Sequence, residues 1–176
     1  MTAAALPRLL VVSSCGDRRR GFLRVGAGLV PCALGRAGIR SAKREGDGAT
    51  PRGPLHPVAV LYRADRGPRP RTALPVGAIR PDSGWCDDPA DRAYNQPVRL
   101  PFAAHHERLW REDRLYDVVV VLDYNMHPVR RGAGSAIFLH IAGDAFAPTA
   151  GCIAVTAPVM RRLLARIGPR TVIRIV

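Results

Sequence analysis

The segments GSAIFLH at residues 134–140 and TAGCI at residues 149–153 decide the fold and the site of this chain. The first is an apolar run that ends on His140, and the second places Cys152 at the start of another apolar run. Cysteine reacts as a thiolate, and histidine is the usual base that produces one. Gly151, directly before the cysteine, permits a sharp turn and leaves room for an incoming carbonyl group. We therefore expect Cys152 to be a nucleophile and His140 to be its base.

The residues alone leave several alternatives open. A cysteine in apolar surroundings is most often an inert core residue, and His140 is open to a purely structural role. His127, in the turn-like stretch before a proline, is a second candidate for the base. His105 and His106 would need a third ligand to bind a metal, so we expect a solvated face there and no metal site.

Short apolar runs separated by glycine and proline predict a protein built mainly from strands. These runs lie at residues 9–12, 22–25, 57–62, 118–122, 136–141, 153–155 and 171–176. The run at 118–122 has no polar alternation, which predicts a central strand buried on both faces. One helix is predicted after Thr156, with an apolar face and a stop at Gly168, and a second short helix near residues 104–110. The fold class is therefore a mostly-β sandwich or partly open barrel with one or two helices.

The length favours a single domain over residues 1–176. Residues 63–101 are rich in proline, arginine, aspartate and glycine, and we expect a long ordered loop that forms a wall or lid of the site. The first residues make a poor signal peptide, since they lack a basic start and their apolar run is broken by Pro7 and Arg8. We expect a strand over residues 8–13 instead, and no integral membrane segment.

The net charge of +13 indicates attraction to polyanions or simply a solvated cationic face. Aromatic residues make up only 6% of the chain, which argues against nucleic acid as the partner. The four cysteines form no CxxC pair, so zinc is not expected. A disulfide between two of Cys15, Cys32 and Cys86 is open, whereas Cys152 must stay free to act as a nucleophile.

The chain resembles the L,D-transpeptidase catalytic domain, the YkuD-type family, over roughly residues 35–176. Members carry a histidine followed by a Ser/Thr-x-Gly-Cys-Ile/Val block, which is similar to TAGCI here. The segment KREGDGATPRG at residues 43–53 resembles their Gly-Asp-Gly-x-Thr-Pro-x-Gly stretch. WCDDP at 85–89, YN at 94–95 and LDYN at 122–125 resemble the middle of one branch of the family.

The resemblance implies a periplasmic or cell-envelope enzyme of cell wall biogenesis that acts by cysteine acyl transfer. Its donor and acceptor are peptidoglycan stem peptides, it needs no metal or other cofactor, and carbapenems acylate its cysteine. The carbonyl of Ile141 would orient the histidine. Most members have Arg or Asn after the Gly-Cys-Ile block, where this chain has Ala154; this variant resembles a branch associated with cross-links to residue 1 of the stem rather than residue 3.

Other site residues follow from position. Backbone N–H groups around Ala150, Gly151 and Cys152 are the expected oxyanion donors, and Thr149 either holds their turn by a side-chain hydrogen bond or is only a turn residue. Side chains in the middle region either line the substrate groove or pack the loop: Trp85, Asp87, Tyr94 and Asn95.

Two rival functions remain. Water in place of the amine would make the protein a carboxypeptidase or amidase, and a structural Cys152 would leave a non-catalytic cationic module that binds the cell wall.

Overall fold

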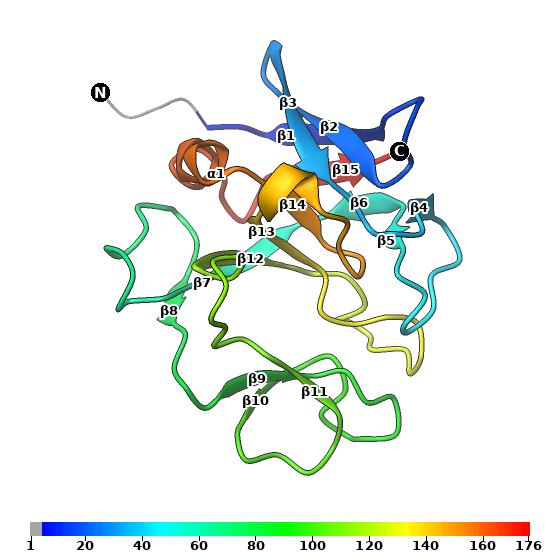
Figure 1. The fold of residues 1–176 in the computed structure, drawn as a ribbon, viewed down its shortest axis with the longest axis vertical. Helices are drawn as coiled ribbons and strands as arrows, with labels where there is room; N and C mark the ends of the chain where they lie inside the picture. Colours follow the sequence, from blue (N-terminus) through cyan, green and yellow to red (C-terminus); the bar gives the residue numbers. More distant parts are fainter. Residues whose placement is uncertain (1–4) are drawn as a thin grey trace.

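The computed structural model describes residues 5–176, and one large sheet organises it (Figure 1). The strands of this sheet are β1 (Arg8–Ser13), β2 (Arg20–Val25), β3 (Gly28–Ala33), β6 (Gly53–Leu55), β7 (Pro57–Tyr62), β8 (Val76–Ala78), β12 (Val118–Leu122), β13 (Phe138–Ile141), β14 (Ile153–Val155) and β15 (Val172–Ile175). They lie in the order β6-β15-β1-β2-β3-β14-β13-β12-β7-β8. The sheet curls into a half-barrel, which confirms the mostly-β prediction.

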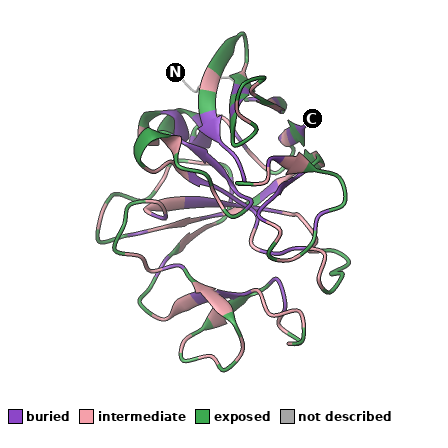
Figure 2. Ribbon diagram, turned by 45° about the vertical axis from the view of Figure 1, so that its right-hand side comes forward, coloured by how far each residue is buried: buried purple, intermediate pink, exposed green. Residues whose placement is uncertain are grey.

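Strand β12 shows why the sheet has two buried faces. It lies between β13 and β7, as its continuous apolar sequence predicts, and residues 119–122 are all buried (Figure 2). Val120 and Leu122 join the larger core, whereas Val119 and Val121 join a second core on the opposite face. The second core contains Cys152, so the site lies on this smaller side of the sheet.

The larger core is covered by α1 (Ala157–Leu164), whose buried side chains pack against the sheet. Thr156 is the N-cap as predicted, although its side chain makes no capping hydrogen bond. The helix ends at Leu164, earlier than the apolar pattern suggests, but Ile167 is still buried in the core. A short 3₁₀ helix, η1 (Asp144–Phe146), connects β13 towards β14.

A separate three-stranded sheet stands over the second core at the bottom of Figure 1. It consists of β9 (Ser83–Cys86), β10 (Pro97–Arg99) and β11 (His106–Arg108), in the order β10-β9-β11. The helix predicted near residues 104–110 is wrong, because this segment pairs with β9 as a strand, and such non-local pairing overrides local propensity. Residues 63–101, predicted as a loop, contain β8, β9 and β10. A small parallel pair, β4 (Ile39–Arg40) and β5 (Thr50–Pro51), flanks the loop that joins them.

The remaining expectations concern the chain start and the cysteines. Residues 8–13 form a strand as predicted, while residues 1–4 of the stretch assessed as a signal peptide lie outside the described residues. All four cysteines are free, so the disulfide left open among Cys15, Cys32 and Cys86 is absent. Within residues 5–176, no helix has the length and apolar character needed to cross a membrane.

Candidate active site

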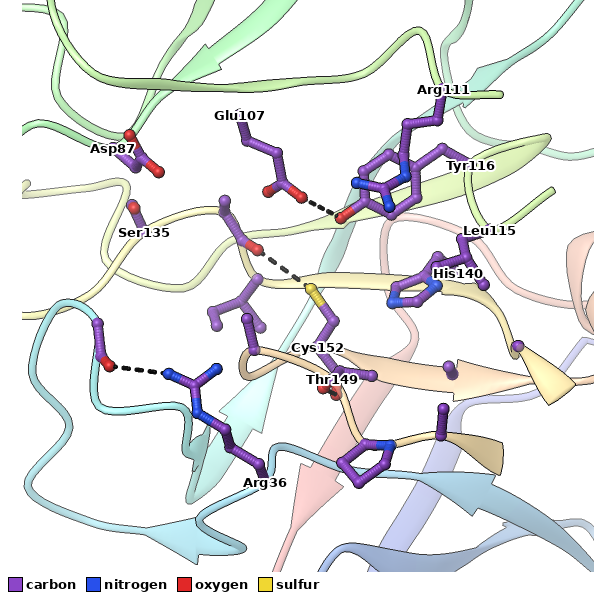
Figure 3. Close-up of a pocket in the computed structure, with 18 of the residues that line it drawn as sticks. Arg36, Asp87, Glu107, Arg111, Leu115, Tyr116, Ser135, His140, Thr149 and Cys152 are labelled. Atoms are coloured by element: carbon purple, nitrogen blue, oxygen red, sulfur yellow. Dashed lines mark hydrogen bonds between the residues drawn. The ribbon is translucent and has the colours of Figure 1, made fainter. Parts of the chain in front are cut away.

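The register of two parallel strands brings Cys152 and His140 to one face of the sheet. Leu139 on β13 pairs with Ile153 on β14, and His140 pairs with Ala154. Because neighbouring residues on a strand face opposite sides, Leu139 and Ile153 point into the larger core, and His140 points away from it. Cys152, one residue before Ile153, lies on the same side as His140, and Figure 3 shows the thiol beside the imidazole ring.

The Cys152 thiol is buried and hydrogen-bonded to the segment before His140. Its Sγ donates to the Ala136 carbonyl at 3.2 Å and accepts from the Phe138 N–H at 3.3 Å. Burial raises the pKa of the thiol to about 12, and the Glu107 carboxylate acts in the same direction. The Phe138 N–H and the Lys43 ammonium oppose this shift. At neutral pH the resting sulfur is therefore a thiol.

The His140 imidazole is held in one tautomer by the backbone. Its Nδ1 lies 2.8 Å from the Ile141 carbonyl oxygen, which only accepts, so Nδ1 carries the proton and Nε2 is the free base. The ring also packs edge-on against Tyr116, with centroids 5.2 Å apart. Burial lowers the pKa of His140 to about 4, against the influence of the Ile141 carbonyl.

The two shifts define the resting state of the pair. A thiol with a raised pKa beside an imidazole with a lowered pKa is an uncharged pair at neutral pH, because both desolvated groups favour their neutral forms. Such a pair can act when a carbonyl enters, with Nε2 as a general base that takes the thiol proton during attack.

The turn before Cys152 is fixed by glycine and threonine. Gly151 has φ of +147°, and a Cβ there would lie 2.8 Å from the Ala49 carbonyl oxygen, so only glycine suits this position. Thr149 Oγ1 accepts from the Gly151 N–H at 3.1 Å and donates to the Cys152 carbonyl at 2.7 Å. Since Gly151 N–H is thereby engaged, the N–H groups of Ala150 and Cys152 are the remaining candidates among the expected oxyanion donors.

The loop at residues 43–49 borders this turn. Lys43 is only 8% exposed, and its Nζ lies 2.8 Å from Asp47 Oδ1. The same ammonium lies 3.5 Å from the position that a Gly151 Cβ would take. Although partial burial acts the other way, Lys43 and two backbone N–H groups hold the pKa of Asp47 below its usual value. The loop thus places a buried positive charge next to the nucleophile turn.

A pocket of about 360 Å³ opens onto Cys152 and His140 (Figure 3). Of the residues singled out from the sequence, Asp87, Thr149, Ala150 and Ala154 also line it. Sequence reasoning missed several charged or polar lining residues: Arg36, Lys43, Glu45, Glu107, Arg111, Tyr116 and Ser135. Only the motif at residues 43–53 carried a signal for any of them. Glu107 follows His105 and His106, where a solvated face was expected, and it lines the pocket.

Three of the four candidate substrate-binding residues are buried and form hydrogen bonds within the protein. Trp85, Tyr94 and Asn95 are 2–3% exposed and do not line the pocket. Asn95 Oδ1 accepts from Trp85 Nε1 and from the Ala136 N–H, while the Tyr94 hydroxyl accepts from the Gly134 N–H. These side chains therefore hold the segment that leads into β13, which agrees with the packing alternative that the sequence left open for them.

The other histidines lie elsewhere. His127 is exposed and does not line the pocket. His105 Nδ1 forms a hydrogen bond with Asp87, and His106 with the Ala104 carbonyl. Across residues 5–176, no group of three His, Cys, Asp or Glu side chains is arranged to hold a metal ion.

The fold and the site together define a mostly-β domain in which a cysteine and a histidine on neighbouring strands share one pocket. A family model described as the L,D-transpeptidase catalytic domain, YkuD, matches residues 10–175, nearly the whole chain. The chain therefore belongs to this family, which acts on peptidoglycan. No curated protein and no solved structure matches the chain.

Proposed function

We propose that this protein is a peptidoglycan L,D-transpeptidase that joins two stem peptides through a cysteine acyl-enzyme, and so acts in cell wall biogenesis and cell shape. The observation that carries the proposal is the placement of Cys152 beside His140 in a pocket of a chain that belongs to this family. No metal or organic cofactor takes part in the proposed reaction.

The first half-reaction makes a thioester. Cys152 Sγ attacks the carbonyl of an L-to-D peptide bond while His140 Nε2 takes the thiol proton. The N–H groups of Ala150 and Cys152 stabilise the negative oxygen. The bond to the leaving amine then breaks, and His140 returns its proton to that amine. The Ile141 carbonyl keeps the imidazole in the tautomer that this step needs.

The second half-reaction transfers the acyl group. An amine of a second stem attacks the thioester, the bond to Cys152 Sγ breaks, and His140 carries a proton from the amine to the sulfur. The products are a new amide bond and the free thiol. Water in place of the amine would release a shortened peptide, which is the carboxypeptidase or amidase alternative.

We further propose that the cross-links involve residue 1 of the stem, L-Ala joined to meso-diaminopimelate. Ala154 lines the pocket and pairs with His140. Where most family members carry Arg or Asn, this chain therefore presents only a methyl group beside the base. The proposed substrate places the protein in the periplasm or cell envelope, where its charge of +13 favours an anionic wall polymer.

The test is incubation of wild type and Cys152→Ala with purified disaccharide-tetrapeptide as the donor and free tetrapeptide, whose residue 1 has an unblocked amine, as the acceptor, followed by mass spectrometry. Dimers from wild type alone would support transpeptidation, and their fragmentation identifies the residues that are joined. Links through residue 3 only would contradict the residue-1 assignment, and shortened monomers only would indicate a hydrolase.

A second assay separates chemistry from binding. A carbapenem should add its mass to wild type and not to Cys152→Ala. If Cys152 stays unmodified at high drug excess while both forms bind peptidoglycan equally, the protein is a cationic binding module and not an enzyme.

A further inference from the structure

The pocket beside Cys152 contains three carboxylates that form no ion pair with lysine or arginine among the described residues, although the whole chain is strongly basic. Glu107, Glu45 and Asp87 line the pocket. Tyrosine hydroxyls donate to Glu107 and Glu45, and the exposed His105 contacts Asp87. Among the described residues, no lysine or arginine forms an ion pair with any of the three.

The cations that line the same pocket are already engaged. Lys43 pairs with Asp47 and Arg111 with Asp113, while Arg36 donates to a backbone carbonyl. On the side of Glu107 and Asp87 the nearby basic groups are the exposed His105, which pairs with Asp87, and Arg111, which acts on Glu107 while it pairs with Asp113. The Glu107 carboxylate is therefore left without an ion-pair partner of its own, which suits a cationic ligand.

An independent observation points to a ligand at this place. Ser135 is 6% exposed, lines the pocket, and its Oγ is a buried oxygen without a hydrogen-bond partner among the described residues. A neighbouring polar group is the Tyr94 phenol, whose pKa is raised by burial and Glu45 and lowered by Ser135. The Ser135 hydroxyl nevertheless does not reach hydrogen-bonding geometry with a partner. Figure 3 shows Ser135 and Asp87 along one side of the pocket, with Glu107 between them and Tyr116. A buried hydroxyl without a partner is stabilised when a ligand supplies one.

Glu107 and Cys152 line the same pocket, and the carboxylate raises the pKa of the thiol. It lies on β11 opposite Trp85 of β9, and Tyr116 donates to its Oε1 at 2.6 Å. Its other oxygen has no hydrogen-bond partner within residues 5–176. Burial raises the pKa of Glu107, so the carboxylate binds a proton more readily than an exposed glutamate does.

We propose that Glu107, Asp87 and Ser135 form the acceptor site, which binds the ammonium group of the second stem peptide, and that Glu107 removes its first proton. This inference rests on the proposed transpeptidase function. An ammonium group has three N–H donors, and the site offers it two carboxylates and a hydroxyl.

The proton balance of aminolysis requires such a group. An acceptor ammonium must lose two protons to become an amide nitrogen. Glu107 takes the first and leaves a neutral amine, which attacks the thioester carbon. His140 takes the second and delivers it to Cys152 Sγ as the carbon–sulfur bond breaks. Glu107 then releases its proton to solvent, and the cycle closes without any other reactant.

The test compares wild type with Glu107→Gln, whose amide oxygen can still accept from Tyr116, and with the exposed control Glu112→Gln. Two rates are measured on each protein: acylation by a carbapenem, which needs no acceptor, and dimer formation from disaccharide-tetrapeptide as the donor and free tetrapeptide, with an unblocked amine on residue 1, as the acceptor. We expect Glu107→Gln to be acylated at least as fast as wild type, because it loses a charge that raises the pKa of Cys152, and to lose about 100-fold or more in dimer formation, the size of a general-base contribution. Transfer to hydroxylamine, an amine uncharged at neutral pH, should survive, and raising the pH should restore part of the dimer formation.

Equal loss of acylation and transfer in Glu107→Gln would overturn the proposal, as would dimer formation at the wild-type rate. Asp87→Asn and Ser135→Ala test acceptor binding separately. Each should raise the acceptor concentration needed for half-maximal dimer formation while acylation is unchanged. If wild type itself is not acylated and forms no dimers, the proposed function fails instead.

Discussion

The buried His140 makes stability depend on pH in a way that can be calculated. Burial lowers its pKa from 6.5 to about 4, so the unfolded chain binds more protons than the folded chain between these values. The stabilising contribution is therefore complete above the unfolded pKa and is lost as the pH falls towards the folded one. At 1.36 kcal/mol per pKa unit the full effect is about 3 kcal/mol, and about 2 kcal/mol is lost between about pH 7 and about pH 5.

The contribution of His140 to the free energy of unfolding is measured by urea unfolding at the two pH values. The proteins compared are wild type, His140→Gln and His127→Gln. Other titrating groups are shared, so the difference in pH dependence between wild type and His140→Gln isolates His140. We expect wild type and the exposed His127→Gln to lose about 2 kcal/mol more than His140→Gln does on acidification. An equal loss in all three proteins would refute a buried, neutral His140.

Three further substitutions test the framework around the site. Gly151→Ala should lower the free energy of unfolding by about 1–3 kcal/mol and abolish carbapenem acylation, because its φ favours glycine and the added Cβ would meet a carbonyl oxygen. Gly16→Ala, where a Cβ has open space, should change neither the melting temperature nor acylation. Thr149→Val should lose about 1–2 kcal/mol in urea unfolding and slow acylation, with both recovered in Thr149→Ser. Asn95→Leu should lower stability by at least about 2 kcal/mol, because buried donors lose their acceptor, while the exposed Gln96→Ala should melt like wild type.

The strands around the site could be predicted because their sequences report local burial. The run at 118–122 is apolar at every position, and β12 is indeed covered on both faces. Cys152 lies beside His140 because of the register between β13 and β14. Both strands are predicted from their apolar sequences, so the pair could be predicted as well.

The acidic side of the pocket could not be predicted, for a physical reason. Residues 106–108 become a strand only by pairing with β9, and that contact, not their local sequence, turns Glu107 towards the nucleophile. The same limit explains why the packing role of Trp85, Tyr94 and Asn95 could not be predicted. Polar and aromatic residues in a proline-rich stretch resemble a binding surface, but Tyr94 and Asn95 form hydrogen bonds with backbone groups distant in the sequence.

The place of β15 in the sheet has a consequence for how the protein folds. Residues 172–175 lie between β1 and β6, so β6 joins the sheet only through this segment, which pairs with strands more than 100 residues earlier in the sequence. Such long-range pairing is slow to form, and the open strand edges of a partly folded chain are prone to aggregate. We therefore expect a variant that lacks the pairing of residues 172–175 to aggregate through the open edges of β1 and β6.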